Sequence, residues 1–140
     1  YSNQRFLNHT RELCLDYLKS FSNTQNIYWV IEDKKTKELY GSITAYIQDN
    51  HGTADIGLMI GNKNSWGKGI GFEAWKLTMD FLLTQYGIRK VTGGTLKTNT
   101  GMIRIMEKSI MIHEAPRKDH ELIDGKPVDI LYFCKFSDDK

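Results

Sequence analysis

Cysteine is scarce in this sequence, and its spacing does not suggest a disulfide framework or a metal site with cysteine ligands. The chain has 140 residues with only two cysteines, Cys14 and Cys134, and no paired CxxC spacing. This pattern indicates reduced, buried thiols in a cytoplasmic protein. The four histidines are scattered, with no second histidine at helical spacing, so we expect no metal site.

A charge excess and long apolar runs are also missing. The net charge is only +2, and no basic cluster is interleaved with aromatic residues, so we expect no nucleic-acid partner. The longest apolar runs are too short to cross a membrane, and no charged segment followed by an apolar core opens the sequence. The composition, 40% hydrophobic and 26% charged, is that of an ordinary globular protein. The length suits a single domain over residues 1–140.

The periodicity of apolar residues predicts an α+β fold. In chain order we expect a helix at 11–21, strands at 27–32, 39–47 and 53–60, a helix at 72–83, a strand at 90–96, a short helix from Asn99 and a strand at 130–136. Residues 117–126 are polar and should form a loop or hairpin tip. One apolar stripe of the second helix comprises Ile70, Ala74, Leu77 and Phe81. This order predicts a mixed central sheet with helices on both faces.

The most informative segment is the glycine-rich stretch Asn64-Ser65-Trp66-Gly67-Lys68-Gly69-Ile70-Gly71, between an expected strand and an expected helix. Glycine permits positive φ and close approach of a ligand to the backbone. A helix start adds backbone N–H groups and a dipole that favour negative charge. The stretch therefore predicts a pyrophosphate cradle, with a plain glycine-rich turn as the alternative. It lacks the G-x-G-x-x-G spacing and the parallel βαβ context of a dinucleotide-binding oxidoreductase.

The order of elements around this loop resembles the GNAT superfamily of acetyl-CoA-dependent N-acetyltransferases. Asn99, followed by Arg104-Ile105-Met106-Glu107-Lys108, matches a second element of that family, and the resemblance spans roughly residues 27–136. The Trp-Gly-Lys-Gly-Ile-Gly form, followed by Glu73-Ala74, is similar to the branch with the ribosomal-protein N-terminal acetyltransferases. The resemblance implies a single-domain GNAT-like fold. Family domains begin with a strand for which this sequence has no room, so we expect that N-terminal strand to be missing.

The resemblance also implies that acetyl-CoA is the co-substrate. The loop backbone would bind its pyrophosphate, residues 58–60 would pair with the peptide-like pantetheine arm, and Asn99 would hydrogen-bond the arm. Helix capping is the alternative role for Asn99. A backbone N–H of Met59 or Ile60 would hold the oxyanion. The implied cofactor-binding residues are Leu58, Met59, Ile60, Trp66, Gly67, Lys68, Gly69, Ile70, Gly71 and Asn99.

Acetyl transfer requires a neutral amine, and hence a base near the thioester. Asp55 stands where the family often places a glutamate, and its shorter side chain favours a water relay. A structural carboxylate is the alternative role for Asp55, and His51 is a second candidate base. Met106 and Met102 stand where relatives supply a tyrosine or serine as proton donor. A water would then protonate the thiolate.

We therefore expect an N-acetyltransferase that moves the acetyl group of acetyl-CoA to a primary amine by direct attack in a ternary complex. A small-molecule amine of the amino-sugar type is favoured, because the basic side chains of residues 117–129 offset the acidic ones. The alternatives are a non-catalytic CoA-binding module and an acetyltransferase acting on a protein N-terminus. The sequence leaves a homodimer open.

Overall fold

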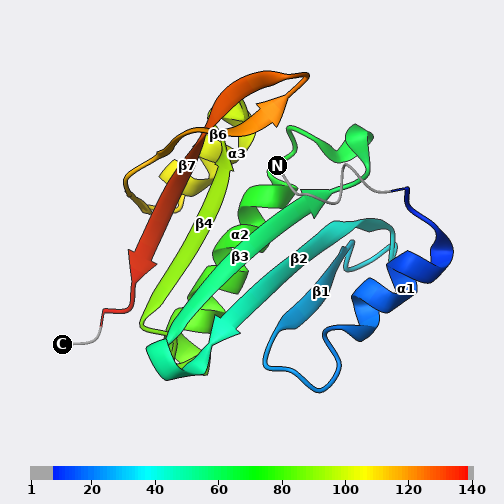
Figure 1. Ribbon diagram of the computed structural model, residues 1–140. Coiled ribbons are helices and arrows are strands. Elements are labelled where there is room, and N and C mark those ends of the chain that lie inside the picture. Colours follow the sequence, from blue (N-terminus) through cyan, green and yellow to red (C-terminus); the bar gives the residue numbers. More distant parts are fainter. Residues whose placement is uncertain (1–7, 139–140) are drawn as a thin grey trace.

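The computed structural model describes residues 8–138, which form three α-helices and seven strands of one sheet (Figure 1). In chain order these are α1 (Arg11–Lys19), β1 (Ile27–Glu32), β2 (Leu39–Gln48), β3 (Thr53–Ile60), α2 (Ile70–Phe81), β4 (Lys90–Leu96), α3 (Thr100–Lys108), β5 (Ile112–His113), β6 (Arg117–Ile123) and β7 (Lys126–Phe136). The expected missing N-terminal strand lies outside the described residues. Within 8–138, none of the helices is both long enough and apolar enough to cross a membrane.

The sheet is mixed, with strand order β1-β2-β3-β4-β7-β5 and β6 paired to β7. All neighbouring strands are antiparallel except β3 and β4, which run parallel. Their pairing covers only residues 53–55 of β3 and 90–92 of β4. Both strands continue beyond these rungs, so the sheet splays open between residues 56–60 of β3 and residues 93–96 of β4. We call this opening the splay.

Helices cover both faces of the sheet, which confirms the α+β expectation. Ile43 and Ile47 of β2 point to α2, where they join a core with Trp75. Tyr46 lies between them in alternation and points the other way, because successive strand side chains face opposite sides. Its hydroxyl is 3.0 Å from that of Tyr17 in α1, so α1 lies on the face opposite α2.

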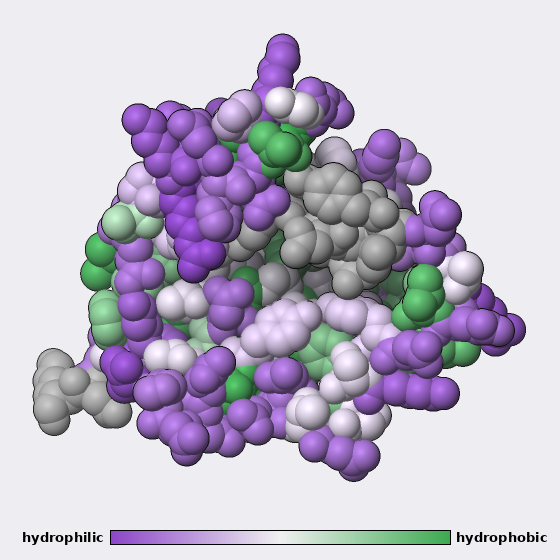
Figure 2. Space-filling model, in the orientation of Figure 1, coloured by the Kyte–Doolittle hydropathy of each residue, from purple (hydrophilic) through white to green (hydrophobic). Residues whose placement is uncertain are grey.

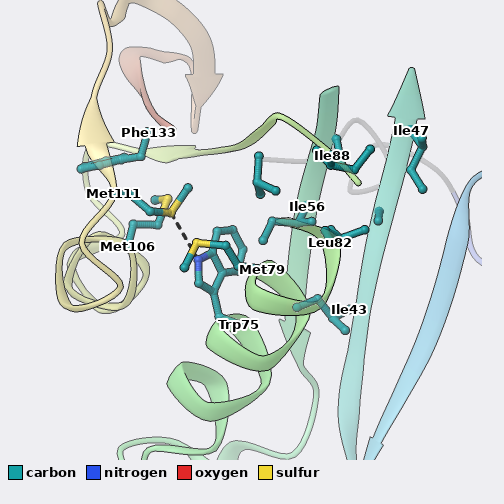
Figure 3. Close-up of a cluster of buried hydrophobic side chains, with 13 residues drawn as sticks. Ile43, Ile47, Ile56, Trp75, Met79, Leu82, Ile88, Met106, Met111 and Phe133 are labelled. Atoms are coloured by element: carbon teal, nitrogen blue, oxygen red, sulfur yellow. Dashed lines mark hydrogen bonds between the residues drawn. The ribbon is translucent and has the colours of Figure 1, made fainter. Parts of the chain in front are cut away.

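The core on the α2 face is built around Trp75, which is 1% exposed (Figure 3). Its indole Nε1 donates a hydrogen bond to Met111 Sδ at 3.3 Å. Met106 of α3 is fully buried beside this pair. This core fixes α2 and α3 against the sheet, and hence fixes the ends of both helices that face the splay.

The buried stripe of α2 differs from the expected one. Trp75 and Met79 of α2, and Leu82 in the helical turn that follows it, face the core, whereas Leu77 is 64% exposed. Both stripes have helical spacing, since 75, 79 and 82 are also i, i+4 and i+7, and periodicity alone does not choose between them. The expected stripe instead lines an open groove of about 610 Å³ between α2 and β1.

The C-terminal third contains more strand than expected. Residues 117–123 form β6, which makes a hairpin with β7 through a turn at Asp124 and Gly125. The strand β7 begins at Lys126 rather than at Ile130, and β5 was not anticipated. Polar side chains are compatible with these strands because β6 is exposed along most of its length. The two thiols also differ: Cys134 is buried as expected, but Cys14 is exposed.

Candidate active site

The glycine-rich loop connects the end of β3 to the start of α2. Gly67 and Gly69 have φ of 77° and 81°, in the left-handed region that glycine adopts without strain. Gly69 is the N-cap of α2, and its lack of a side chain means that it supplies no capping oxygen. The first-turn N–H groups of α2 therefore point out of the helix toward a common site, where the helix dipole favours an anion.

The three glycines have different surroundings. A Cβ built on Gly67 or Gly69 would meet no atom within 4 Å, so open space lies in front of both. A Cβ on Gly71 would lie 3.1 Å from Ile105 Cδ1 and 3.2 Å from Leu58 Cδ2. Gly71 therefore also allows α2 to pack closely against α3 and β3.

Trp66 attaches this loop to β3. Its indole Nε1 donates a 2.8 Å hydrogen bond to the carbonyl of Ile60, while the residue as a whole is 61% exposed. The loop is therefore held against the last residue of β3, at the open side of the splay. This contact places the N-terminus of α2, the candidate anion site, directly beyond the free edge of the strand.

The free edge of β3 presents the backbone groups of every second residue to the splay. Two hydrogen bonds just outside the strand show which residues these are. The carbonyl of Gly52 accepts from the N–H of Arg89 on the β4 side, and the N–H of Gly61 donates to the carbonyl of Tyr40 on the β2 side. Because backbone groups alternate along a strand, Leu58 and Ile60 direct theirs toward the splay.

By the same alternation, the N–H and C=O of Met59 face Ser42 of β2. Its side chain, 62% exposed, lies on the face that carries Asp55. The backbone groups available to a peptide-like arm are thus those of Leu58 and Ile60. The Ile60 carbonyl already accepts from Trp66, so its N–H is the group left to donate.

Asp55 lies at the point where β3 and β4 separate. It is opposite Thr92 in the last parallel rung, and the Thr92 hydroxyl donates to Asp55 Oδ1 at 2.7 Å. Its neighbours Ala54 and Ile56 are buried on the α2 face, so its side chain points to the α1 face, where it keeps contact with solvent. Burial by surrounding atoms raises the pKa of Asp55, and the Thr92 hydrogen bond partly opposes this. A carboxylate with a raised pKa is better matched to accepting a proton near neutral pH.

Of the other residues considered for the site, only Asn99 has a polar group available to a ligand near the splay. Asn99 caps α3, since its Oδ1 accepts from Met102 N–H at 3.1 Å, which leaves its amide NH₂ as the group for a ligand. His51 lies in the turn before β3, at the opposite end of the strand from the loop. Met106 is buried in the core and Met102 packs against it, so neither supplies a proton.

Sequence reasoning missed Thr92. The residue belongs to the strand predicted at 90–96, but its role depends on parallel pairing of β3 with β4 and on their register. The spacing of residues along the sequence does not reveal which residue of β4 lies opposite Asp55. Its only sequence signal is that it shares the polar side of an alternating strand with Lys90.

Comparison with known proteins agrees with this geometry. The family profile described as acetyltransferase (GNAT) domain matches residues 2–111. An uncharacterized N-acetyltransferase, p20 of Bacillus licheniformis, is 28% identical over 101 residues, which are 71% of this chain. This chain spans 56% of the length of that curated relative.

Solved structures share the fold at low sequence identity. A spermidine N-acetyltransferase from Vibrio cholerae, in complex with CoA and spermine, superimposes with a TM-score of 0.83 at 20% identity, covering 94% of this chain and 77% of that one. A ribosomal-protein-S5-alanine acetyltransferase from Vibrio fischeri gives 0.77 at 18% identity, with 92% and 71% covered. With the family profile covering most of its length, the chain belongs to the GNAT acetyltransferase domain family.

Proposed function

We propose that this protein, as a single domain, transfers the acetyl group of acetyl-CoA to a primary amine by direct attack within a ternary complex. One observation carries the proposal: the sheet opens at a solvent-accessible carboxylate, Asp55, and the free edge of β3 leads from there to a glycine-built anion site. Ile60 lies five residue steps after Asp55, a distance of about 17 Å along an extended strand. A long, peptide-like arm bound along this edge would bring its reactive end to Asp55.

The glycine-rich loop would bind the pyrophosphate of acetyl-CoA, and β3 would bind its pantetheine arm. The pyrophosphate would accept hydrogen bonds from N–H groups between Trp66 and Gly71, with the Lys68 ammonium at the rim. The arm would pair with the backbone groups of Leu58 and Ile60, as an added strand does. The Met59 side chain would line the arm, and the Asn99 amide would donate to it.

Asp55 would receive the proton that the acceptor amine must lose, through one water molecule. The amine nitrogen then forms the C–N bond as the C–S bond breaks. The N–H of Leu58, the nearer of the two free N–H groups to Asp55, would stabilise the charge that develops on the carbonyl oxygen. Water would protonate the departing thiolate, because Met102 and Met106 have no proton to give.

The acceptor would approach from the α1 face, where Tyr46 lies opposite Asp55 in the β2–β3 pairing. Burial and the hydrogen bond with Tyr46 raise the pKa of Tyr17, so that hydroxyl stays protonated as a donor or acceptor. Hydrophilic side chains gather at the rim of this face, with paler, more apolar side chains toward its middle (Figure 2). We favour a polar small molecule of the amino-sugar type over an apolar amine.

A positive charge near this face argues against a polycation. The Arg117 guanidinium lies 5.1 Å from the centre of the Tyr132 ring, and Tyr132 pairs with Gly94 on the face that Thr92 occupies. Spermidine, the substrate named for the Vibrio cholerae neighbour, would be repelled by this charge. A protein N-terminus remains the second acceptor class, and a CoA-binding module without catalysis is the alternative outcome.

A thiol-release assay across an amine panel tests this proposal. The panel holds an amino sugar, a nucleotide-linked amino sugar, spermidine and a peptide with a free N-terminus. We expect thiol release that requires both acetyl-CoA and an amine, fastest with an amino sugar, and an acetylated product by mass spectrometry. Acetyl-CoA binding with no release on any amine would replace the proposal with the non-catalytic module.

A further inference from the structure

We propose that Thr92 is a positioning residue, which fixes the Asp55 carboxylate at the point where β3 and β4 separate so that it can accept a proton in the acetyl-transfer reaction. The inference rests on the proposed function for its catalytic consequence. The hydrogen bond between Thr92 and Asp55 does not depend on the proposed function, and its effect on Asp55 can be measured separately.

The contact is built into the sheet. Thr92 and Asp55 form the last rung of the parallel β3–β4 pairing. Each is also paired on its other side, Asp55 with Tyr46 of β2 and Thr92 with Cys134 of β7, so the sheet fixes both Cα positions. Beyond this rung the strands part, and a carboxylate there would otherwise rotate freely into the cleft. The 2.7 Å bond from the Thr92 hydroxyl holds one carboxylate oxygen, Oδ1, in place. Threonine suits this task because its β-branched side chain is restricted at χ1.

Two other polar groups on this face have partners of their own. Tyr46, across β2 from Asp55, shares its hydroxyl with Tyr17 of α1. Lys90, two residues before Thr92 on β4, is ion-paired with Glu114. The pKa of Asp55 responds to two influences: burial, which raises it, and the Thr92 hydroxyl, which lowers it by donating to the ionised form. Thr92 therefore favours the ionised carboxylate that a base requires.

The sharpest test compares Thr92→Val, which keeps the shape but removes the hydroxyl, with Thr92→Ser, which keeps the hydroxyl. We expect Thr92→Val to lower kcat by up to about 100-fold through misplacement of the base. The acidic limb of its kcat/KM profile should move to higher pH, while the KM for acetyl-CoA stays unchanged. Thr92→Ser should restore both the rate and the pH profile to near those of the unmodified protein. A Thr92→Val variant with unchanged rate and profile would overturn the proposal.

A double variant separates positioning from a general structural role. In an Asp55→Asn background, Thr92→Val should cause no further loss of rate, because Thr92 acts only through Asp55. An additional loss equal to that of the single variant would contradict the proposal. Should Thr92→Val not fold, Thr92→Ala removes the same hydroxyl and enters the same comparison.

Carboxyl-carbon NMR on protein labelled with ¹³C-aspartate gives a readout that needs no activity. The Asp55 signal is assigned by its absence in Asp55→Asn. Its titration midpoint should rise in Thr92→Val and stay in place in Thr92→Ser. An unchanged midpoint in Thr92→Val would reject the Thr92–Asp55 link, whereas a shifted midpoint in a protein that acetylates no amine would reject only the proposed function.

Discussion

Asp55→Asn should reduce turnover by about 100- to 10,000-fold while leaving the affinity for acetyl-CoA unchanged. The amide keeps the size of the carboxylate, and its oxygen still accepts from the Thr92 hydroxyl, so the local geometry survives. What it loses is basicity. The acidic limb of the kcat/KM profile, which reports the base of the free enzyme, should flatten in the variant. Rates and acetyl-CoA titrations on one protein preparation measure both quantities.

The same variant should be at least as stable as the unmodified protein at neutral pH. The folded state holds the Asp55 proton more tightly than the unfolded chain, because burial raises the pKa of this carboxyl. Its contribution to stability is therefore present below the unfolded pKa, about 3.9, and is lost as the pH rises through the higher folded pKa. Asparagine avoids that loss, and the loss is small because Asp55 remains exposed to solvent, so its Tm should match that of the unmodified protein at pH 8.

A structural role for Asp55 predicts the opposite pattern. The Tm of Asp55→Asn would then fall, with little change in the rate per folded molecule. Asp49→Asn, in the exposed turn before β3, is the matched control and should leave both quantities unchanged. A full-rate Asp55→Asn enzyme would remove Asp55 from the mechanism.

Gly69→Val should abolish binding of acetyl-CoA without unfolding the protein. A Cβ at this position meets no protein atom within 4 Å, so the side chain would enter the open space where the pyrophosphate must approach. The positive φ of 81° adds strain of roughly 1–2 kcal/mol for a residue with a Cβ, which a folded domain tolerates. Calorimetry with acetyl-CoA measures the affinity, and circular dichroism checks the fold.

Gly125→Val is the matched control for this experiment. Gly125 has a similar φ of 75° and equally open surroundings, but it lies in the β6–β7 turn. It should lose similar stability and keep its affinity for acetyl-CoA. If Gly69→Val binds acetyl-CoA as tightly as Gly125→Val does, the loop does not hold the phosphates.

The strands beside the site could be predicted closely from the sequence. Predicted bounds for β1, β3 and β4 coincide with the structure, because each combines β-branched or alternating residues with a clear polar or glycine boundary. The buried face of α2 could not be predicted, since apolar residues occupy most of this helix and two stripes fit its period equally well. The polar strand β6 was also beyond sequence reasoning, because its pairing with β7 rather than its own composition makes it a strand.

The candidate site divides in the same way. The loop glycines could be singled out because their chemistry depends on local sequence: a strand, a glycine turn and a helix start. Asp55 could be singled out only through the family resemblance, because it stands where the family often places a glutamate. Thr92 could not, because it reaches Asp55 only through tertiary pairing across 37 residues of chain. The direction of the Met59 backbone likewise depends on which neighbour β3 pairs with at each end.

A crystal structure of the protein with acetyl-CoA bound tests the central claim most directly. We predict the diphosphate within hydrogen-bond distance of backbone N–H groups between Trp66 and Gly71, the pantetheine arm alongside Leu58 and Ile60 in the splay, and the thioester one water away from Asp55. A diphosphate bound away from this loop, or an arm lying outside the splay between β3 and β4, would contradict the account.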